Sequence, residues 1–150
     1  MVPPDAFRRQ VLNHRKDLWQ IQDSVEYAQE IISKEQDIGP GQCTRLVNSI
    51  RSAENPLREF YALLDTPEQL PLAARSHRHP LLIILDNATG LLHDLINSIS
   101  TLHEVYRTSS YQEADFSRQQ ILDQLDAFIQ RKDDIVDNID SLLLQANAYK

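Results

Sequence analysis

Histidine, cysteine and carboxylate side chains are the groups of this chain that could bind a metal or transfer a chemical group, and their spacing limits which reactions are open to them. In four-helix bundles that bind two metal ions, a glutamate stands three residues before a histidine on two of the helices. None of the five histidines has an acidic residue at that position, which is occupied by Val11, Ala74, Ser76, Gly90 and Ser100. The Cys-x-x-Cys-His sequence of attached haem is also absent. We therefore expect no metal centre and no bound cofactor.

Two other candidates are the pair of histidines His77 and His79 and the single cysteine, Cys43, and neither has further ligands or a partner in the local sequence. His77 and His79 flank Arg78, but a pair without further ligands is interpreted as a solvated loop rather than a metal site. Cys43 falls on an apolar helical stripe, where a free cysteine behaves as a small hydrophobic residue. No catalytic residue is predicted, and we expect the chain not to be an enzyme.

The sharpest local pattern is the sequence His93-Asp94-Leu95-Ile96-Asn97-Ser98-Ile99. It resembles the phosphoacceptor box of histidine kinases and histidine phosphotransfer proteins. The resemblance implies a small four-helix bundle in which an outward-pointing His93 takes a phosphoryl group from an aspartyl phosphate. Phosphotransfer proteins keep a lysine where this chain has Ile96, and Asp94 adds a like charge beside a phosphohistidine. We therefore expect His93 to remain unphosphorylated, and phosphotransfer is the alternative to our leading hypothesis.

Four segments of the chain carry apolar residues at alternating spacings of three and four, which is the period of one helix face. The first segment shows the pattern with Phe7, Val11, Leu18 and Ile21. The stripes predict helices over about 4–33, 41–64, 80–107 and 111–148.

Proline and glycine mark where these predicted helices begin, bend and end. The glycines and proline of 39–41 predict a loop after the first helix. Pro56 interrupts the second stripe without changing its phase, so it predicts a kink within one helix. The sequence of 66–69 resembles a capping box and predicts a short helical turn in the connection 65–79. Pro80 is expected to open the third helix, and Ser110 to cap the fourth.

Four amphipathic helices joined by short connections predict an all-α, antiparallel four-helix bundle with up-down-up-down topology. We expect at least three quarters of the residues to be helical, with no β-strand. The positions expected to be almost fully buried are Leu18, Ile50, Leu92 and Ile135. The length of 150 residues suits a single domain over 1–150. Whether this domain is complete or the N-terminal part of a longer protein is left open.

The composition limits the partners that the chain can have. Acidic residues outnumber basic ones by 22 to 15, and the net charge of −7 argues against a protein that binds nucleic acids or anionic membranes. The chain has only 3 glycines, which excludes glycine-rich phosphate loops. No signal peptide or membrane-spanning segment is apparent, so we expect a cytoplasmic location.

The leading functional hypothesis is a non-enzymatic helical module for protein–protein interaction, acting as an adaptor or regulator. Its partner would be another protein or a second copy of the chain, bound through the third or fourth predicted helix. The interface candidates are Leu82 and Ile83, which turn away from the main apolar stripe, and Tyr149 near the end of the fourth helix. A third hypothesis is a helical-bundle executioner or signalling domain at the N-terminus of a cell-death protein, which architecture alone suggests.

Overall fold

The chain is helical over most of its length. The computed structural model describes residues 4–34 and 38–148, except for the side chains of Pro4, Gln69, Ala73 and residues 145–148. Its helices are α1 (Pro4–Ser33), α2 (Pro40–Arg51), α3 (Glu54–Leu64), α4 (Arg75–Ser100), α5 (Leu102–Thr108) and α6 (Tyr111–Ala148). Two short 3-10 turns, η1 (Pro67–Gln69) and η2 (Leu72–Ala74), lie in the predicted connection. Helices make up 91% of the described residues, which contain no strand, so the all-α prediction is confirmed.

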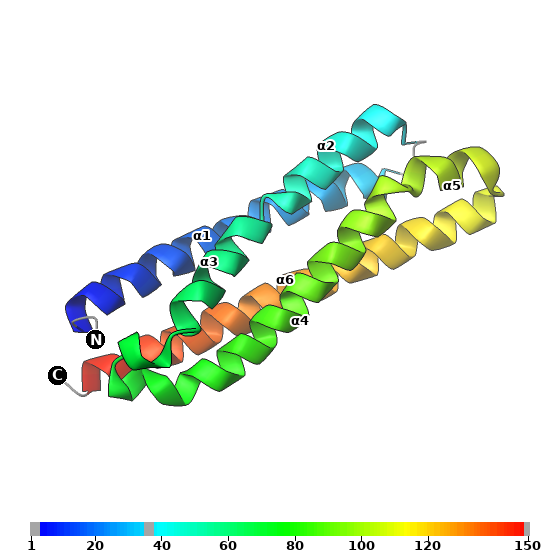
Figure 1. Ribbon diagram of the computed structural model, residues 1–150. Coiled ribbons are helices and arrows are strands. Elements are labelled where there is room, and N and C mark those ends of the chain that lie inside the picture. The colour runs from blue at the N-terminus through cyan, green and yellow to red at the C-terminus, as the bar shows by residue number, and fades with distance from the viewer. Residues whose placement is uncertain (1–3, 35–37, 149–150) are drawn as a thin grey trace.

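The helices form an antiparallel bundle with four long rods (Figure 1). Helix α1 runs away from the end at which both termini lie, and α2 and α3 return along it. Helices α4 and α5 then run outward, and α6 returns to the starting end, which confirms the up-down-up-down topology. Both α1 and α4 pack against α6 and against the α2–α3 rod. These two helices therefore occupy opposite corners of the bundle.

The second rod contains the predicted kink. Helix α2 ends at Arg51 and α3 begins at Glu54, so the break falls just before Pro56. Proline has no N–H group to bond with the carbonyl of Ser52, and its ring crowds that carbonyl. Because Ala53 and Leu57 on either side of Pro56 are both buried, the apolar stripe continues in phase across the break.

The third rod begins earlier than the sequence predicted. Helix α4 starts at Arg75 directly after η2, so the expectation that Pro80 opens this helix is wrong, and Pro80 lies inside it. The missing N–H group of Pro80 removes only one backbone hydrogen bond near the start of a long helix. Arg78 also holds this first turn, because its Nε donates to the Leu64 carbonyl at 2.7 Å and its Nη2 lies 3.7 Å from Asp65 Oδ1.

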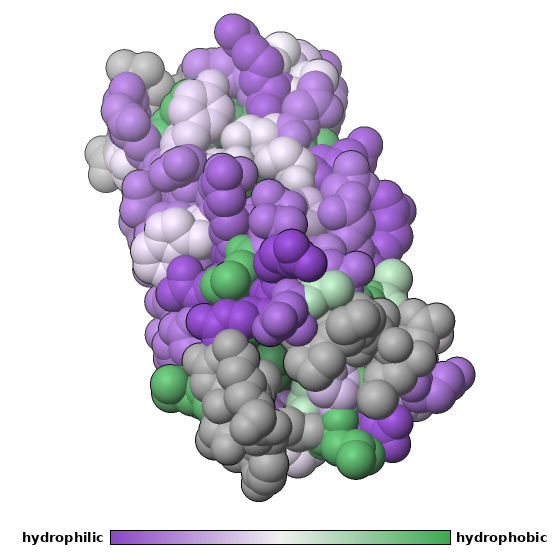
Figure 2. All heavy atoms as spheres, turned by 90° about the vertical axis from the view of Figure 1, so that its left-hand side faces the viewer, coloured by the Kyte–Doolittle hydropathy of each residue, from purple (hydrophilic) through white to green (hydrophobic). Residues whose placement is uncertain are grey.

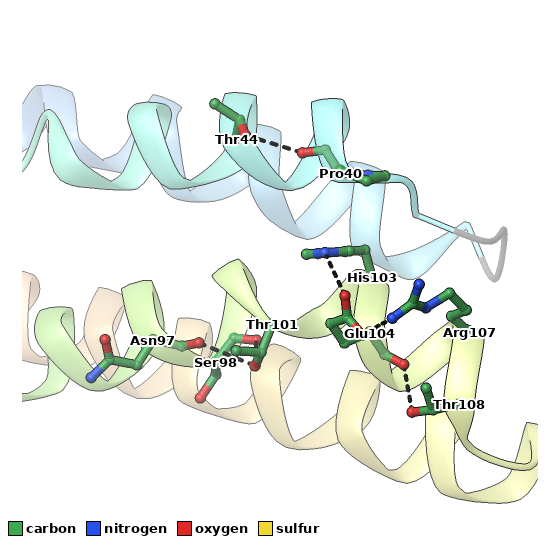
Figure 3. A network of polar contacts seen from close by, with 9 residues as sticks. All are labelled: Pro40, Thr44, Asn97, Ser98, Thr101, His103, Glu104, Arg107 and Thr108. Carbon is green, nitrogen blue, oxygen red and sulfur yellow. Dashed lines mark hydrogen bonds and ion pairs between the residues drawn. The ribbon is translucent and has the colours of Figure 1, made fainter.

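A second departure lies near the far end of the same rod, where a single helix over 80–107 was expected. The rod divides into α4 and α5 at Thr101. The Thr101 hydroxyl donates to the carbonyls of Asn97 and Ser98, both at 3.3 Å (Figure 3). A threonine that bonds to the preceding turn in this way competes with the regular backbone ladder.

The core and the last helix agree with the sequence analysis. Leu18, Ile50, Leu92 and Ile135 are all 0% exposed, as predicted. The N–H group of Glu113 donates to Ser110 Oγ at 3.2 Å, which confirms Ser110 as the cap of α6. The helical stripes were therefore assigned to the correct faces.

Candidate functional site

His93 lies on the exposed side of α4, immediately after the fully buried Leu92. It lines a shallow depression together with Ile96 and Asn97 of the same helix. The opposite wall is made by Arg51, the last residue of α2, and Glu54, the first residue of α3. The depression therefore lies where the kinked rod faces α4, and the outward position expected for His93 is confirmed.

Arg51 and Glu54 are the members of this depression that sequence reasoning missed. An arginine can pair with phosphoryl or carboxylate oxygens, so it supplies the cation that the sequence around His93 lacks. Glu54 lies in the same wall but is 3.9 Å from Arg58 Nη1, which offsets part of its charge. The sequence did contain a signal that Arg51 lies near His93. The second and third rods are antiparallel and are joined around Leu72. Because Arg51 and His93 are equally far in sequence from Leu72, they are expected at the same height in the bundle.

A second polar cluster lies at the far end of the bundle, between the start of α2 and α5 (Figure 3). His103 Nε2 is 3.4 Å from Glu104 Oε1, and Arg107 Nη2 donates to Glu104 Oε2 at 2.6 Å. The Thr108 hydroxyl donates to the Glu104 carbonyl at 2.7 Å. Each of these bonds stays within α5, so the cluster stabilises this short helix.

Cys43 does not complete a nucleophilic site with His103. The cysteine is 2% exposed and belongs to the main hydrophobic core. Burial raises the pKa of its thiol, while a hydrogen bond with the His103 backbone acts in the opposite direction. A buried thiol with a raised pKa is a poor nucleophile, which supports the interpretation of Cys43 as a core residue.

His14 is a partly buried histidine of α1 that faces α3. Its ring packs against Phe60 in a tilted arrangement, with a centroid distance of 5.5 Å. Burial lowers the pKa of His14, and the carboxylates of Glu59 and Asp17 partly oppose that shift. The imidazole is therefore neutral near pH 7 and packs as an aromatic residue of the helix interface.

Neither metal binding nor a membrane span finds support in the described residues. Within 4–34 and 38–148, no group of three or more histidine, cysteine, aspartate or glutamate side chains is arranged to hold a metal ion. In the same part of the chain, every helix is too short or too polar to cross a membrane.

The predicted interface residues have different environments. Leu82 is only 9% exposed and belongs to the core, so it offers little surface to a partner and its interpretation as an outward residue is wrong. The buried face of α4 is wide because α6, α2, α3 and η2 all pack on it. Ile83 is 48% exposed, as expected for an interface candidate. Tyr149 lies outside the described residues.

Two further apolar residues are exposed at the same end of the bundle as Ile83. Leu72 of η2 is 74% exposed, and Leu144 near the end of α6 is 71% exposed. At this end of the molecule several separate groups of hydrophobic side chains reach the surface among largely polar surroundings (Figure 2). Within this connection Leu70 takes the buried position, whereas Leu72 points into solvent.

The chain was compared with models of protein families, with curated proteins and with solved structures, and no match was found. The side chains described above are therefore the basis on which a function can be assigned.

Proposed function

We propose that this chain is a non-enzymatic interaction module that binds a protein partner through the third and fourth rods of its bundle. The observation that carries the proposal is the exposure of Ile83 on α4 and of Leu144 on α6, together with Leu72 on the intervening η2 turn. Large apolar side chains that are exposed on neighbouring elements of a small domain are typical of a protein-binding surface.

The arrangement of these residues supports a rigid docking surface. Turn η2 contacts both α4 and α6, so the exposed Leu72 is held by the same elements that carry the other two side chains. Beneath them, Leu70 and Ala74 are fully buried and anchor the connection to the core. A partner would therefore meet a backbone that is already ordered, which reduces the entropy lost on binding.

Replacing Ile83 with aspartate is expected to weaken partner binding by about tenfold or more, because the complex would have to bury an unpaired carboxylate. The partner can be found by photo-cross-linking from position 83 in cells, and the purified pair can then be titrated by calorimetry. Asn97→Asp is the matched control, since it adds the same charge to an exposed position about 21 Å further along α4. Unchanged affinity of a folded Ile83→Asp variant would contradict the proposed surface.

A second candidate function is phosphoryl acceptance by His93, and the position of Arg51 favours it. Arg51 lines the depression in which a phosphohistidine would lie, and an arginine there could pair with the phosphoryl oxygens. Glu54 in the same wall and Asp94 beside the histidine would repel those oxygens. Because two carboxylates would repel the phosphoryl group and only one arginine would attract it, we rank phosphotransfer below the binding function.

We also propose a cytoplasmic location for the module. It is supported by Cys43, which is a free and buried thiol, as is usual for proteins of reducing compartments.

A further inference from the structure

Helix α1 carries a second stripe of residues on its solvent-exposed side. The stripe repeats at helical spacing and all of its members are exposed: Arg9, Leu12, Lys16, Trp19, Asp23, Tyr27 and Glu30. Its three large apolar members are Leu12, Trp19 and Tyr27, which are 41%, 52% and 43% exposed. We refer to these seven residues as the α1 stripe.

Charge is distributed unequally along the α1 stripe. The basic members, Arg9 and Lys16, precede Trp19, whereas the acidic members, Asp23 and Glu30, follow it. Within the described residues, Arg9, Lys16 and Asp23 form no ion pair, and Glu30 has only an exposed contact of 3.7 Å with Lys34 Nζ. The charges of the stripe are therefore available to an external partner.

We propose that the α1 stripe is a self-association surface, on which a second copy of the chain packs with its own α1 antiparallel. When the twofold axis passes beside Trp19, Arg9 lies level with Glu30 of the second copy, and Lys16 lies level with its Asp23. The apolar residues Leu12 and Tyr27 are brought level in the same way. A parallel arrangement would instead place each charge opposite an identical one, so electrostatics select the antiparallel dimer.

Trp19 is fixed at the centre of this surface by the protein itself. Its ring lies under the ammonium group of Lys132, with 4.0 Å between Nζ and the ring centroid. Lys132 belongs to α6 and is 2% exposed, so it holds the indole from the interior side while the other parts of the ring remain exposed. A tryptophan held in this way is typical of the central residue of an interface.

The size of the stripe indicates a weak dimer. From Arg9 to Glu30 the helix extends about 32 Å, and one helix face of that length buries less area than stable interfaces do. The dimer is therefore expected to form only at high protein concentration. It also leaves the surface around Ile83 free, because α1 and α4 occupy opposite corners of the bundle.

Charge reversal at Lys16 and Asp23 tests both the surface and its orientation. Sedimentation equilibrium of the full chain, from about 10 µM to 1 mM, should show a monomer–dimer equilibrium. Lys16→Glu alone and Asp23→Lys alone should each weaken dimerisation by about tenfold or more, since each places like charges opposite one another twice. A mixture of these two variants should form a heterodimer with wild-type affinity, because every charge then faces its opposite.

The control is Gln10→Glu, which changes the charge of an exposed α1 residue outside the stripe and should leave dimerisation unchanged. Circular dichroism of each variant shows whether the bundle is still folded. If the wild type remains monomeric up to about 1 mM, the proposal is overturned, and the stripe would then bind a different protein rather than a second copy of the chain. Folded single variants that dimerise as the wild type does, or a mixture that fails to restore affinity, would also overturn it.

Discussion

Replacing Leu92 with alanine is expected to lower the free energy of unfolding by about 2–5 kcal/mol, which is the usual cost of truncating a fully buried leucine. Leu92 is 0% exposed and lies in the second half of α4, the helix that packs against α6, α2 and α3. Because several helices contribute to its surroundings, no single one can move to fill the cavity without losing contacts elsewhere. Urea unfolding followed by circular dichroism measures the change.

His93→Ala is the matched control for this substitution, because it shortens the next side chain of the same helix at an exposed position. Its effect on the free energy of unfolding should stay within about 0.5 kcal/mol. A loss of less than about 1 kcal/mol for Leu92→Ala would mean that this face of α4 does not face the core.

Lys132 is expected to show the second large effect, because it is a lysine with 2% exposure in the apolar stripe of α6. Its ammonium group is satisfied by the Trp19 ring and by the carboxylate of Asp133. Lys132→Glu should lower the free energy of unfolding by more than about 3 kcal/mol, since it buries a carboxylate next to Asp133. Lys132→Met keeps the volume and removes the charge, so it should change stability by only about 1 kcal/mol in either direction.

Arg131→Glu is the control, because it makes the same charge reversal at an exposed neighbour that pairs with Asp134 at 3.6 Å. Its cost should stay below about 1 kcal/mol, as is usual for surface ion pairs. Equal losses for Lys132→Glu and Arg131→Glu in chemical denaturation would contradict the buried position of Lys132.

Much of the fold could be predicted because the information is local. The period of the apolar residues identifies the buried face of each helix, and Pro56 marks the kink at the correct place. Helix boundaries were less predictable at Pro80, because a favourable contact between Arg78 and the end of α3 extends the helix before the proline. Such contacts depend on tertiary packing, which the local sequence does not contain.

The sequence could predict only those features of the candidate site that depend on a single helix. The outward position of His93 follows from the neighbouring core residue Leu92, and the exposure of Ile83 follows from the same stripe. The partners that come from other helices, Arg51 beside His93 and Trp19 beside Lys132, required the packing of the bundle. Leu82 was misplaced because the number of neighbours around α4 decides how wide its buried face is.

The central claim, that this chain acts by binding a protein rather than by accepting a phosphoryl group, is tested most directly by incubating it with a radiolabelled, phosphorylated receiver domain. A histidine phosphotransfer protein labelled in parallel shows that the donor is active. We predict no acid-labile label on the chain, because Asp94 and Glu54 oppose the charge of a phosphohistidine at position 93. Label that appears on the wild type, disappears in His93→Gln and falls in Arg51→Ala would contradict the account and establish phosphotransfer as the function.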